Sequence, residues 1–213
     1  MNSEAIAGVE IPDSRLAREA TELIRDTTNE LLFHHSSRVF LFGVLQARAL
    51  SLAPDPELLY VAALFHDTGL VDPYRTTTQR FELDGADEAR AFLLTHGIDA
   101  RSADTVWAAI ALHTTPEVPY RMDPIVAATT AGVEMDVLGL NLTRIPRELR
   151  EQVVAAHPRP DFKRRILSAF RDGFSNRPDT TFGTVNADVL AHFDPGFVRG
   201  DFVKVIEGSD WAE

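Results

Sequence analysis

The sequence predicts an all-α protein with a single domain. Apolar residues recur at helical spacing along most of the chain, and Ser, Asp, Pro and Gly residues punctuate these segments. No segment alternates between apolar and polar residues over a length that would suggest a strand. A length of 213 residues suits one domain with one core. We expect residues 1–13 to be a flexible segment and residues 14–213 to form the domain, with a helical extension at its C-terminal end.

The expected helices lie at about residues 14–31, 36–52, 55–69, 84–96, 102–113, 124–138, 146–156, 161–174 and 185–193. Ser14 is a favourable N-cap for the first helix, and Pro54 follows the end of the second. Pro56 suits the first turn of the third helix, and Gly69 is a residue type that often follows a helix end.

The fourth and fifth helices are predicted from Asp84 and Ser102 as N-caps, with Gly97 ending the fourth and Pro116 following the fifth. Pro124 opens the sixth helix. The last three helices are predicted from the helical spacing of their apolar residues alone, and a short tail follows them.

Composition and charge exclude several classes of protein. The chain is 45% hydrophobic and 25% charged, as soluble globular proteins are, and its longest apolar run, 58–65, is far shorter than the roughly 20 residues of a membrane span. Residues 1–13 lack the features of a secretory signal, and the chain has no cysteine, so a cytoplasmic location is expected. A net charge of -11 disfavours nucleic acid. The expected partner is a small-molecule substrate, without nucleic acid or membrane, and a homo-oligomer is a further option.

Several polar residues fall on apolar helix faces. His66, His113 and Asp136 follow apolar residues at helical spacing, and His35 precedes Val39 and Phe42 at the same spacing, so all four side chains are expected to point inward. A single histidine of this kind is more often a hydrogen-bonded core residue, which is the alternative for each. Asp67 is harder to explain in that way, because a buried carboxylate needs a cation, a cap or a metal ion. The mixed nitrogen and oxygen donors suit Zn, Fe, Mn or Ni.

The order His35, then His66-Asp67, then Asp136 resembles the HD superfamily of metal-dependent hydrolases, which is named after the His-Asp doublet. Six stretches are similar to successive motifs of its cyanamide hydratase branch: HHSSRVFLFG (34–43), ALFHDTG (63–69), RFELDGADEARAFLLTHG (80–97), VWAAIALHT (106–114), GVEMDVLGL (132–140) and RPDTTFG (177–183). The resemblance implies a helical HD-domain fold over most of the chain.

The resemblance also implies the ligands of one divalent transition metal ion, which are His35, His66, Asp67 and Asp136. Zn or Fe is the expected metal, with Mn or Ni as alternatives. His34 stands where that branch is expected to have Asn, and His35 is preferred as the ligand because it is in line with the apolar face of its helix.

The implied activity is that of a hydrolase or hydratase, in which a metal-activated water attacks a small electrophilic carbon; hydration of cyanamide to urea is the implied reaction. Asp67 and His113 are the expected catalytic residues, for proton transfer. Thr68 and Thr114 are expected to bind the substrate, with helix termination as the alternative. Arg38 is expected either to orient one of the two aspartates, Asp67 or Asp136, or to form a surface ion pair.

Three other polar residues are assigned structural roles. We expect Glu82 to cap the helix near Asp84, His96 to cap the end of that helix, and both His157 and His192 to lie on the surface.

Two alternative functions remain open. The first is an HD-type phosphohydrolase acting on a nucleotide or phosphoester. Leu70 disfavours it, because phosphohydrolases of the superfamily often have Lys at that position, although Arg75 or Arg80 can replace the cation. The second is a non-enzymatic helical binding protein with a structural metal site.

Overall fold

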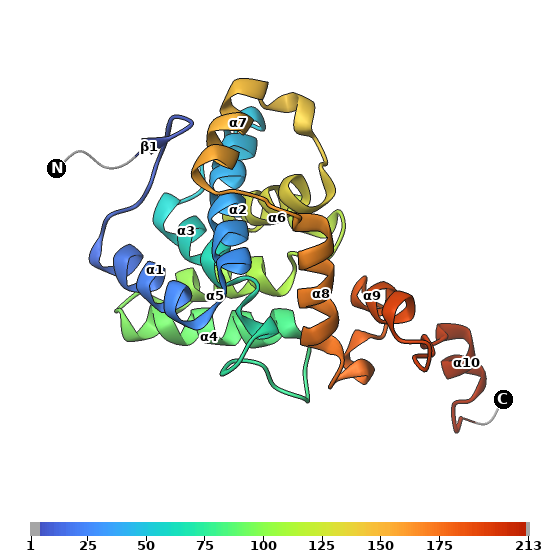
Figure 1. Ribbon diagram of the computed structural model, residues 1–213. Coiled ribbons are helices and arrows are strands. Elements are labelled where there is room, and N and C mark those ends of the chain that lie inside the picture. The colour runs from blue at the N-terminus through green and yellow to red at the C-terminus, as the bar shows by residue number, and fades with distance from the viewer. Residues whose placement is uncertain (1–4, 212–213) are drawn as a thin grey trace.

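The computed structural model describes residues 5–211, and most of them are helical (Figure 1). The α-helices are α1 (Arg15–Thr27), α2 (Glu30–Ala49), α3 (Pro56–Phe65), α4 (Phe81–Thr95), α5 (Ala100–Ala111), α6 (Pro124–Val133), α7 (Arg147–Ala156), α8 (Phe162–Phe174), α9 (Asn186–Phe193) and α10 (Phe202–Glu207). Short 3-10 turns are η1 (Thr68–Leu70), η2 (Val118–Arg121), η4 (Leu142–Arg144) and η5 (Pro178–Thr181), and a π-helix, η3 (Glu134–Leu138), follows α6. The predicted all-α class is confirmed.

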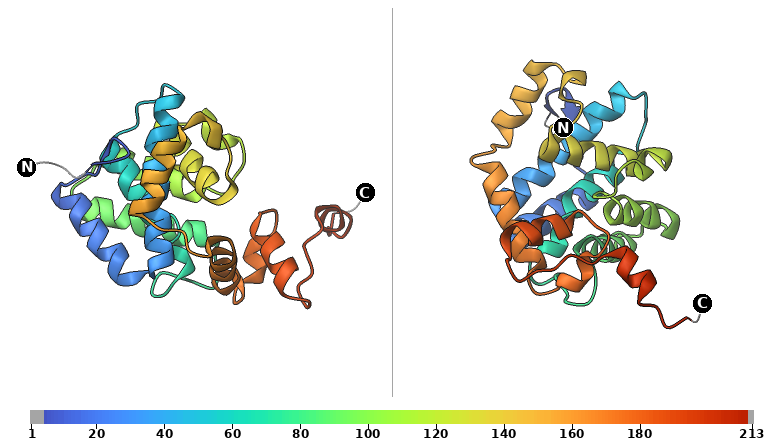
Figure 2. Two further views of the ribbon diagram at one scale, coloured as in Figure 1. Left: turned by 45° about the horizontal axis from the view of Figure 1, so that its top comes forward. Right: turned by 90° about the vertical axis from the view of Figure 1, so that its right-hand side faces the viewer.

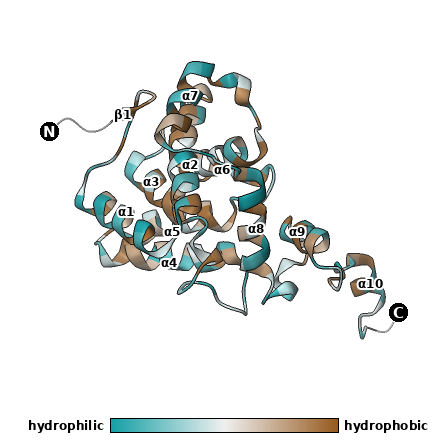
Figure 3. Cartoon of the chain, viewed as in Figure 1, coloured by the Kyte–Doolittle hydropathy of each residue, from teal (hydrophilic) through white to brown (hydrophobic). Residues whose placement is uncertain are grey.

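The helices α2 and α3 form the centre of the bundle. Every residue of α3 from Leu59 onward is buried, and α2 is buried over most of its length. Helices at the periphery have one hydrophobic and one hydrophilic face, as the brown and teal of α1 show in Figure 3. Figures 1 and 2 show that α10 projects away from this body at the C-terminal end.

The segment predicted as one helix over 14–31 belongs to two helices. Ser14 caps α1 as predicted, accepting a hydrogen bond from Ala17 N, but α1 ends at Thr27. Asn29 then caps α2 by accepting a hydrogen bond from Leu32 N. The prediction was wrong because it overlooked Asn as a start signal. His35 consequently lies in the second turn of α2 and not at its beginning.

The third helix ends earlier than predicted. Asp55 caps it and Pro56 begins it, as expected, but α3 ends at Phe65 and not near Gly69. A Cβ atom at Gly69 would lie 2.1 Å from the carbonyl oxygen of Phe81. Glycine is therefore required there by the close approach of α4. His66 occupies the C-cap position of α3.

Two predicted N-caps were wrong. Helix α4 begins at Phe81, with Arg80 in the cap position and no side-chain cap, while Asp84 is buried inside the helix. Helix α5 begins at Ala100 and is capped by Asp99, to which Ser102 donates a hydrogen bond. Tertiary packing uses Asp84 for a buried ion pair, which a local capping rule does not reveal.

Both ends of the described chain contain elements that the sequence pattern did not predict. Strands β1 (Ala5–Ile6) and β2 (Val9–Glu10) form an antiparallel hairpin within the segment expected to be flexible. Ala7 and Val9 of this hairpin are buried in the main core cluster. Helix α10 lies in the expected tail. Within residues 5–211, no helix is both long enough and apolar enough to cross a membrane.

Candidate metal centre

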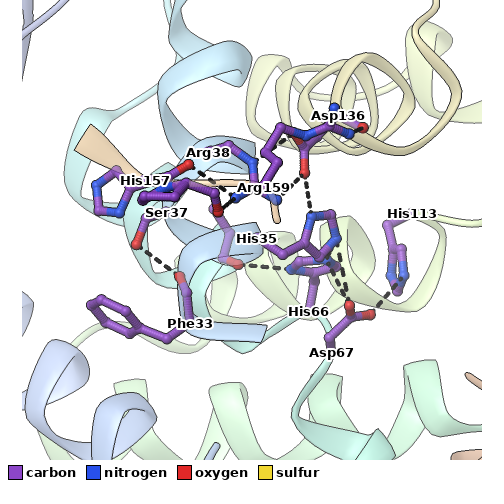
Figure 4. Close-up of polar contacts among 12 residues, drawn as sticks. Phe33, His35, Ser37, Arg38, His66, Asp67, His113, Asp136, His157 and Arg159 are labelled. Carbon is purple, nitrogen blue, oxygen red and sulfur yellow. Dashed lines mark hydrogen bonds and ion pairs between the residues drawn. The ribbon is translucent and has the colours of Figure 1, made fainter. Parts of the chain in front are cut away.

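Four helical segments bring the predicted site residues together near the end of α3 (Figure 4). His35 comes from α2, His66 and Asp67 follow α3, His113 follows α5, and Asp136 lies in the π-helix η3. None of these five residues is more than 3% exposed. The site is therefore enclosed by the helical core.

Each of the three histidines has its Nδ1 atom against an oxygen acceptor. The distances are 2.7 Å from His66 to Ala63 O, 2.6 Å from His113 to Ile110 O and 2.7 Å from His35 to Asp136 Oδ2. The two carbonyls belong to the last turns of α3 and α5, where helix ends leave acceptors free. Because such oxygens only accept, Nδ1 carries the proton, and Nε2 presents a lone pair on the opposite side of the ring.

These Nε2 atoms face each other and the carboxylate of Asp67. The His35 and His66 Nε2 atoms are 3.2 Å apart, and Asp67 Oδ2 lies 3.5 and 3.4 Å from them. His113 Nε2 lies 3.7 Å from Asp67 Oδ1. Figure 4 shows the three rings around this carboxylate. Imidazole nitrogens that converge on a carboxylate in this way form a donor set suited to a cation.

Asp67 has no hydrogen-bond partner for either oxygen, although both are buried. Its contacts with the imidazoles are longer than ordinary hydrogen bonds. Burial lowers the pKa of His66 to about 3, against the opposing attraction of Asp67. His66 is therefore neutral near pH 7 and forms no ion pair with Asp67. An uncompensated buried carboxylate costs several kcal/mol.

The donors fit a divalent transition metal ion. Ligand atoms of His35, His66 and Asp67 all lie within 4.8 Å of one another. Tetrahedral ligands at 2.0–2.1 Å from an ion lie about 3.3 Å apart, and the observed separations of 3.2 to 3.5 Å match this spacing. Neutral imidazole nitrogens and a carboxylate suit Zn, Fe, Mn or Ni.

Asp136 lies on the other side of the His35 ring. Its oxygens accept from His35 Nδ1 at 2.7 Å and from Arg38 at 2.8 and 2.9 Å, and Arg159 Nε lies 3.2 Å away. Burial would raise the pKa of Asp136, but hydrogen bonds from His35 and Arg38 outweigh this effect and hold the pKa well below its ordinary value. As placed, Asp136 orients His35, and its role as a metal ligand stays a prediction.

Arg38 contacts Asp136 and has a side chain that is 0% exposed. Arg38 therefore contacts Asp136 and not Asp67, and it does not form a surface ion pair. Arg38 also donates hydrogen bonds to the carbonyls of His157 and Pro158, which follow α7. No sequence pattern pointed to Arg159, because its contact with Asp136 depends on how the chain returns after α7.

His34 points away from the cluster. Its Nδ1 atom lies 3.2 Å from Nδ1 of His157, which is partly buried and not on the surface as predicted. Burial, followed by the charges of His34 and Arg38, lowers the pKa of His157 to about 4. His34 and His157 thus form a separate pair beside the site.

The hydroxyls of Thr68 and Thr114 are engaged within the protein. Thr68 Oγ1 donates to Phe65 O at 2.8 Å, as a helix-terminating residue does. Thr114 Oγ1 donates to Glu82 Oε1 at 2.6 Å. Each hydroxyl oxygen can still accept a hydrogen bond from a substrate. Their role in substrate binding stays a prediction.

Sequence reasoning assigned Glu82 to the wrong role. Glu82 does not cap a helix: its side chain is fully buried, and it accepts hydrogen bonds from Arg80 at 2.8 Å and Asn186 at 3.1 Å in addition to Thr114. Its position on the buried face of α4 was the available signal. Because Thr114 directly follows His113, this network holds the chain beside His113.

An all-α fold that buries a His-His-Asp donor set between its helices defines a class of helical metal-binding proteins. The comparison with protein families identifies the class further: the model of the HD domain matches residues 32–156, which is more than half of the chain. The chain belongs to the HD domain family, a superfamily of metal-dependent hydrolases. The match includes all five site residues and ends before α8.

Proposed function

We propose that this protein is a metal-dependent hydratase or hydrolase of a small substrate, with cyanamide or a related nitrile-type compound as the candidate. The observation that carries the proposal is the buried Asp67 carboxylate, which has no hydrogen-bond partner and faces the Nε2 atoms of His35 and His66. A divalent metal ion held by these residues would supply Lewis-acid activation of water at neutral pH.

The protein's own groups would fix the donors and move protons. Asp136 and the carbonyl of Ala63 hold the Nδ1 protons of His35 and His66, so both rings keep Nε2 directed at the centre. His113 is held in the same way by Ile110 O. Its Nε2 faces Asp67 Oδ1 at 3.7 Å, so the two groups form a suitable pair for accepting a proton and returning it.

The burial of the site supports a small substrate. His35, His66 and His113 are at most 3% exposed, and aromatic rings flank two of them. The ring of Phe162 lies 5.4 Å from that of His35, and the ring of Phe81 lies 5.5 Å from that of His113. Apolar walls at this distance favour a compact, uncharged electrophile over a nucleotide.

One observation favours the phosphohydrolase alternative. Arg80 is 32% exposed and donates to Thr114, next to His113, so a cation lies near the site. The same guanidinium is paired with Glu82 at 2.8 Å, which compensates its charge. This pairing makes Arg80 a weaker phosphate-binding group, and hydration stays the preferred function.

Elemental analysis combined with two assays tests the proposal. Purified protein should contain about one transition metal ion per chain and convert cyanamide to urea, and it should release no phosphate from nucleotides or phosphoesters. Asp67→Asn should lose both metal and activity, while Asp72→Asn, at an aspartate whose side chain is 77% exposed, should keep both. Phosphate release would favour the phosphohydrolase, and metal content without either activity would favour a structural metal site.

A further inference from the structure

Arg177 lies just beyond α8, outside the residues that match the family, and its side chain is 0% exposed. All three guanidinium nitrogens are engaged. Nε donates to Gly173 O at 2.9 Å, Nη1 to Gln79 O at 3.2 Å and to Asp84 Oδ2, and Nη2 to Gly69 O. The fork-shaped guanidinium thus joins the end of α8, the loop before α4 and the turn η1.

The turn η1 follows Asp67 directly and is tightly enclosed. Leu70 N donates to Asp67 O at 3.0 Å, which closes the turn. A Cβ atom at Gly69 would lie 2.1 Å from Phe81 O, and one at Gly173 would lie 2.6 Å from Leu70 Cδ2. The chain after Asp67 is therefore held between the beginning of α4 and the end of α8.

The carboxylate of Asp67 has no hydrogen bond that would fix its direction. Its direction consequently depends on the backbone of the residues around it. Arg177 supplies a hydrogen bond to that backbone from another part of the chain, at Gly69 O. The ion pair with buried Asp84 compensates the charge of Arg177. The carbonyls of Gly173 and Gln79 hold the guanidinium in place independently of that charge.

We propose that Arg177 is a positioning residue of the metal centre, which fixes the backbone of η1 and thereby the direction of the Asp67 carboxylate. This inference rests on the proposed metal site. The competing interpretation is that Arg177 and Asp84 form a buried ion pair that stabilises the fold alone. The two interpretations predict different metal binding for a variant that keeps the positive charge at position 177 but lacks the forked guanidinium.

Arg177→Lys makes this distinction, because lysine can pair with Asp84 but has no fork that also reaches Gly69 O. The measurements are Co²⁺ affinity, the visible absorption spectrum of the Co²⁺-loaded protein and the melting temperature of the metal-free protein. We expect Arg177→Lys to bind Co²⁺ about 10- to 100-fold more weakly and with an altered spectrum, as loss of an outer-shell contact does. Arg164→Gln, at an arginine of α8 that is 74% exposed, should match the wild type in all three.

Asp84→Asn provides the complementary variant. It removes the ion pair but leaves Arg177 able to donate to Gly69 O, so the melting temperature should fall while the Co²⁺ spectrum stays that of the wild type. An Arg177→Lys protein with wild-type affinity and spectrum would overturn the inference. So would one that fails to fold, because the guanidinium would then support the whole fold. Wild-type protein that binds no Co²⁺ would instead contradict the proposed function, so the two failures are distinct.

Discussion

At the scale of single residues, three buried aspartates differ in how their charge is compensated. Asp136 is paired with Arg38, and Asp84 is paired with Arg177, and all four of these side chains are fully buried. Asp67 is equally buried but has no hydrogen-bond partner and no Arg or Lys partner among the described residues. A protein retains such a destabilising charge where function requires it, and the proposed metal site would supply that function here.

Asp67→Asn should therefore stabilise the metal-free protein while abolishing metal binding. The substitution removes an uncompensated charge while keeping the shape of the side chain, so it should raise the free energy of unfolding by about 1–3 kcal/mol. Urea denaturation after metal removal measures this change, and Asp72→Asn should change the free energy of unfolding by less than about 0.5 kcal/mol. A metal-free Asp67→Asn protein that is less stable than the wild type would show that Asp67 has a favourable partner.

The pair His34 and His157 gives a pH dependence with a defined sign. The pKa of His157 is lowered from 6.5 to about 4 by burial and neighbouring positive charges. Below pH 6.5 the unfolded chain therefore binds a proton that the folded protein does not, so stability falls as the pH decreases from about 6.5 to about 4. His157→Gln should make this decrease shallower in urea denaturation at pH 7, 5.5 and 4.5.

His192→Gln is the control for this measurement, because His192 is exposed. It should leave the pH dependence of unfolding unchanged. If the free energy of unfolding decreases equally with pH in His157→Gln and in the wild type, other groups cause the acid sensitivity.

At the scale of elements, the contact of α2 with α6 sets the distance between His35 and Asp136. Gly132 of α6 lies against the backbone of α2, where an added Cβ atom would be 2.2 Å from Val39 O and 3.0 Å from Gly43 N. Small residues thus allow the two helices to approach closely. The π-helix η3, which continues α6, then presents Asp136 to the ring of His35.

Gly132→Ala tests this packing, because helix propensity and sterics predict opposite signs. Alanine is favoured over glycine in a helix by about 1 kcal/mol, but a 2.2 Å contact with rigid backbone forces the helices apart. We expect a net destabilisation of about 1–3 kcal/mol in denaturant unfolding, together with weaker metal binding. Gly196→Ala, where the nearest atom is Asp194 Oδ1 at 3.3 Å, should be close to neutral.

At the scale of the whole molecule, the chain after residue 156 completes the structure around the site. A second core cluster combines apolar residues of α2, η1 and α4 with those of α8 and α9; its buried members are Leu31, Leu32, Leu70, Phe81, Phe162, Ile166, Phe174 and Leu190. The segment that matches the HD domain ends at residue 156, so it contributes only part of this cluster.

Truncation tests the contribution of this region. A chain ending at residue 156 should be much less stable than the full chain or should aggregate, because it exposes the first four members of the second cluster. A chain ending at residue 200 should keep its stability, since the side chains of α10 are exposed. Melting curves and light scattering distinguish the two, and a stable 1–156 protein would show that the HD segment folds without its extension.

The sequence by itself determined the helical class, the positions of most helices and the candidate residues of the metal site. Helical spacing and caps such as Ser14 and Asp55 are local signals, so they can be recognised in one stretch of chain. The inward direction of His35, His66 and His113 followed from the same periodicity, and all three are buried.

Only the tertiary structure decided the partners of the buried charges. The pairs Asp136 with His35, and Asp84 with Arg177, join residues 101 and 93 positions apart, and capping rules misassigned Asp84 and Glu82. A buried carboxylate selects its partner from whichever cation or imidazole the packed helices bring within hydrogen-bond distance, and no local pattern contains that information. The same physical reason leaves Asp67 without a hydrogen bond, because the groups that surround it are the imidazoles of His35, His66 and His113, which come from α2 and from the ends of α3 and α5.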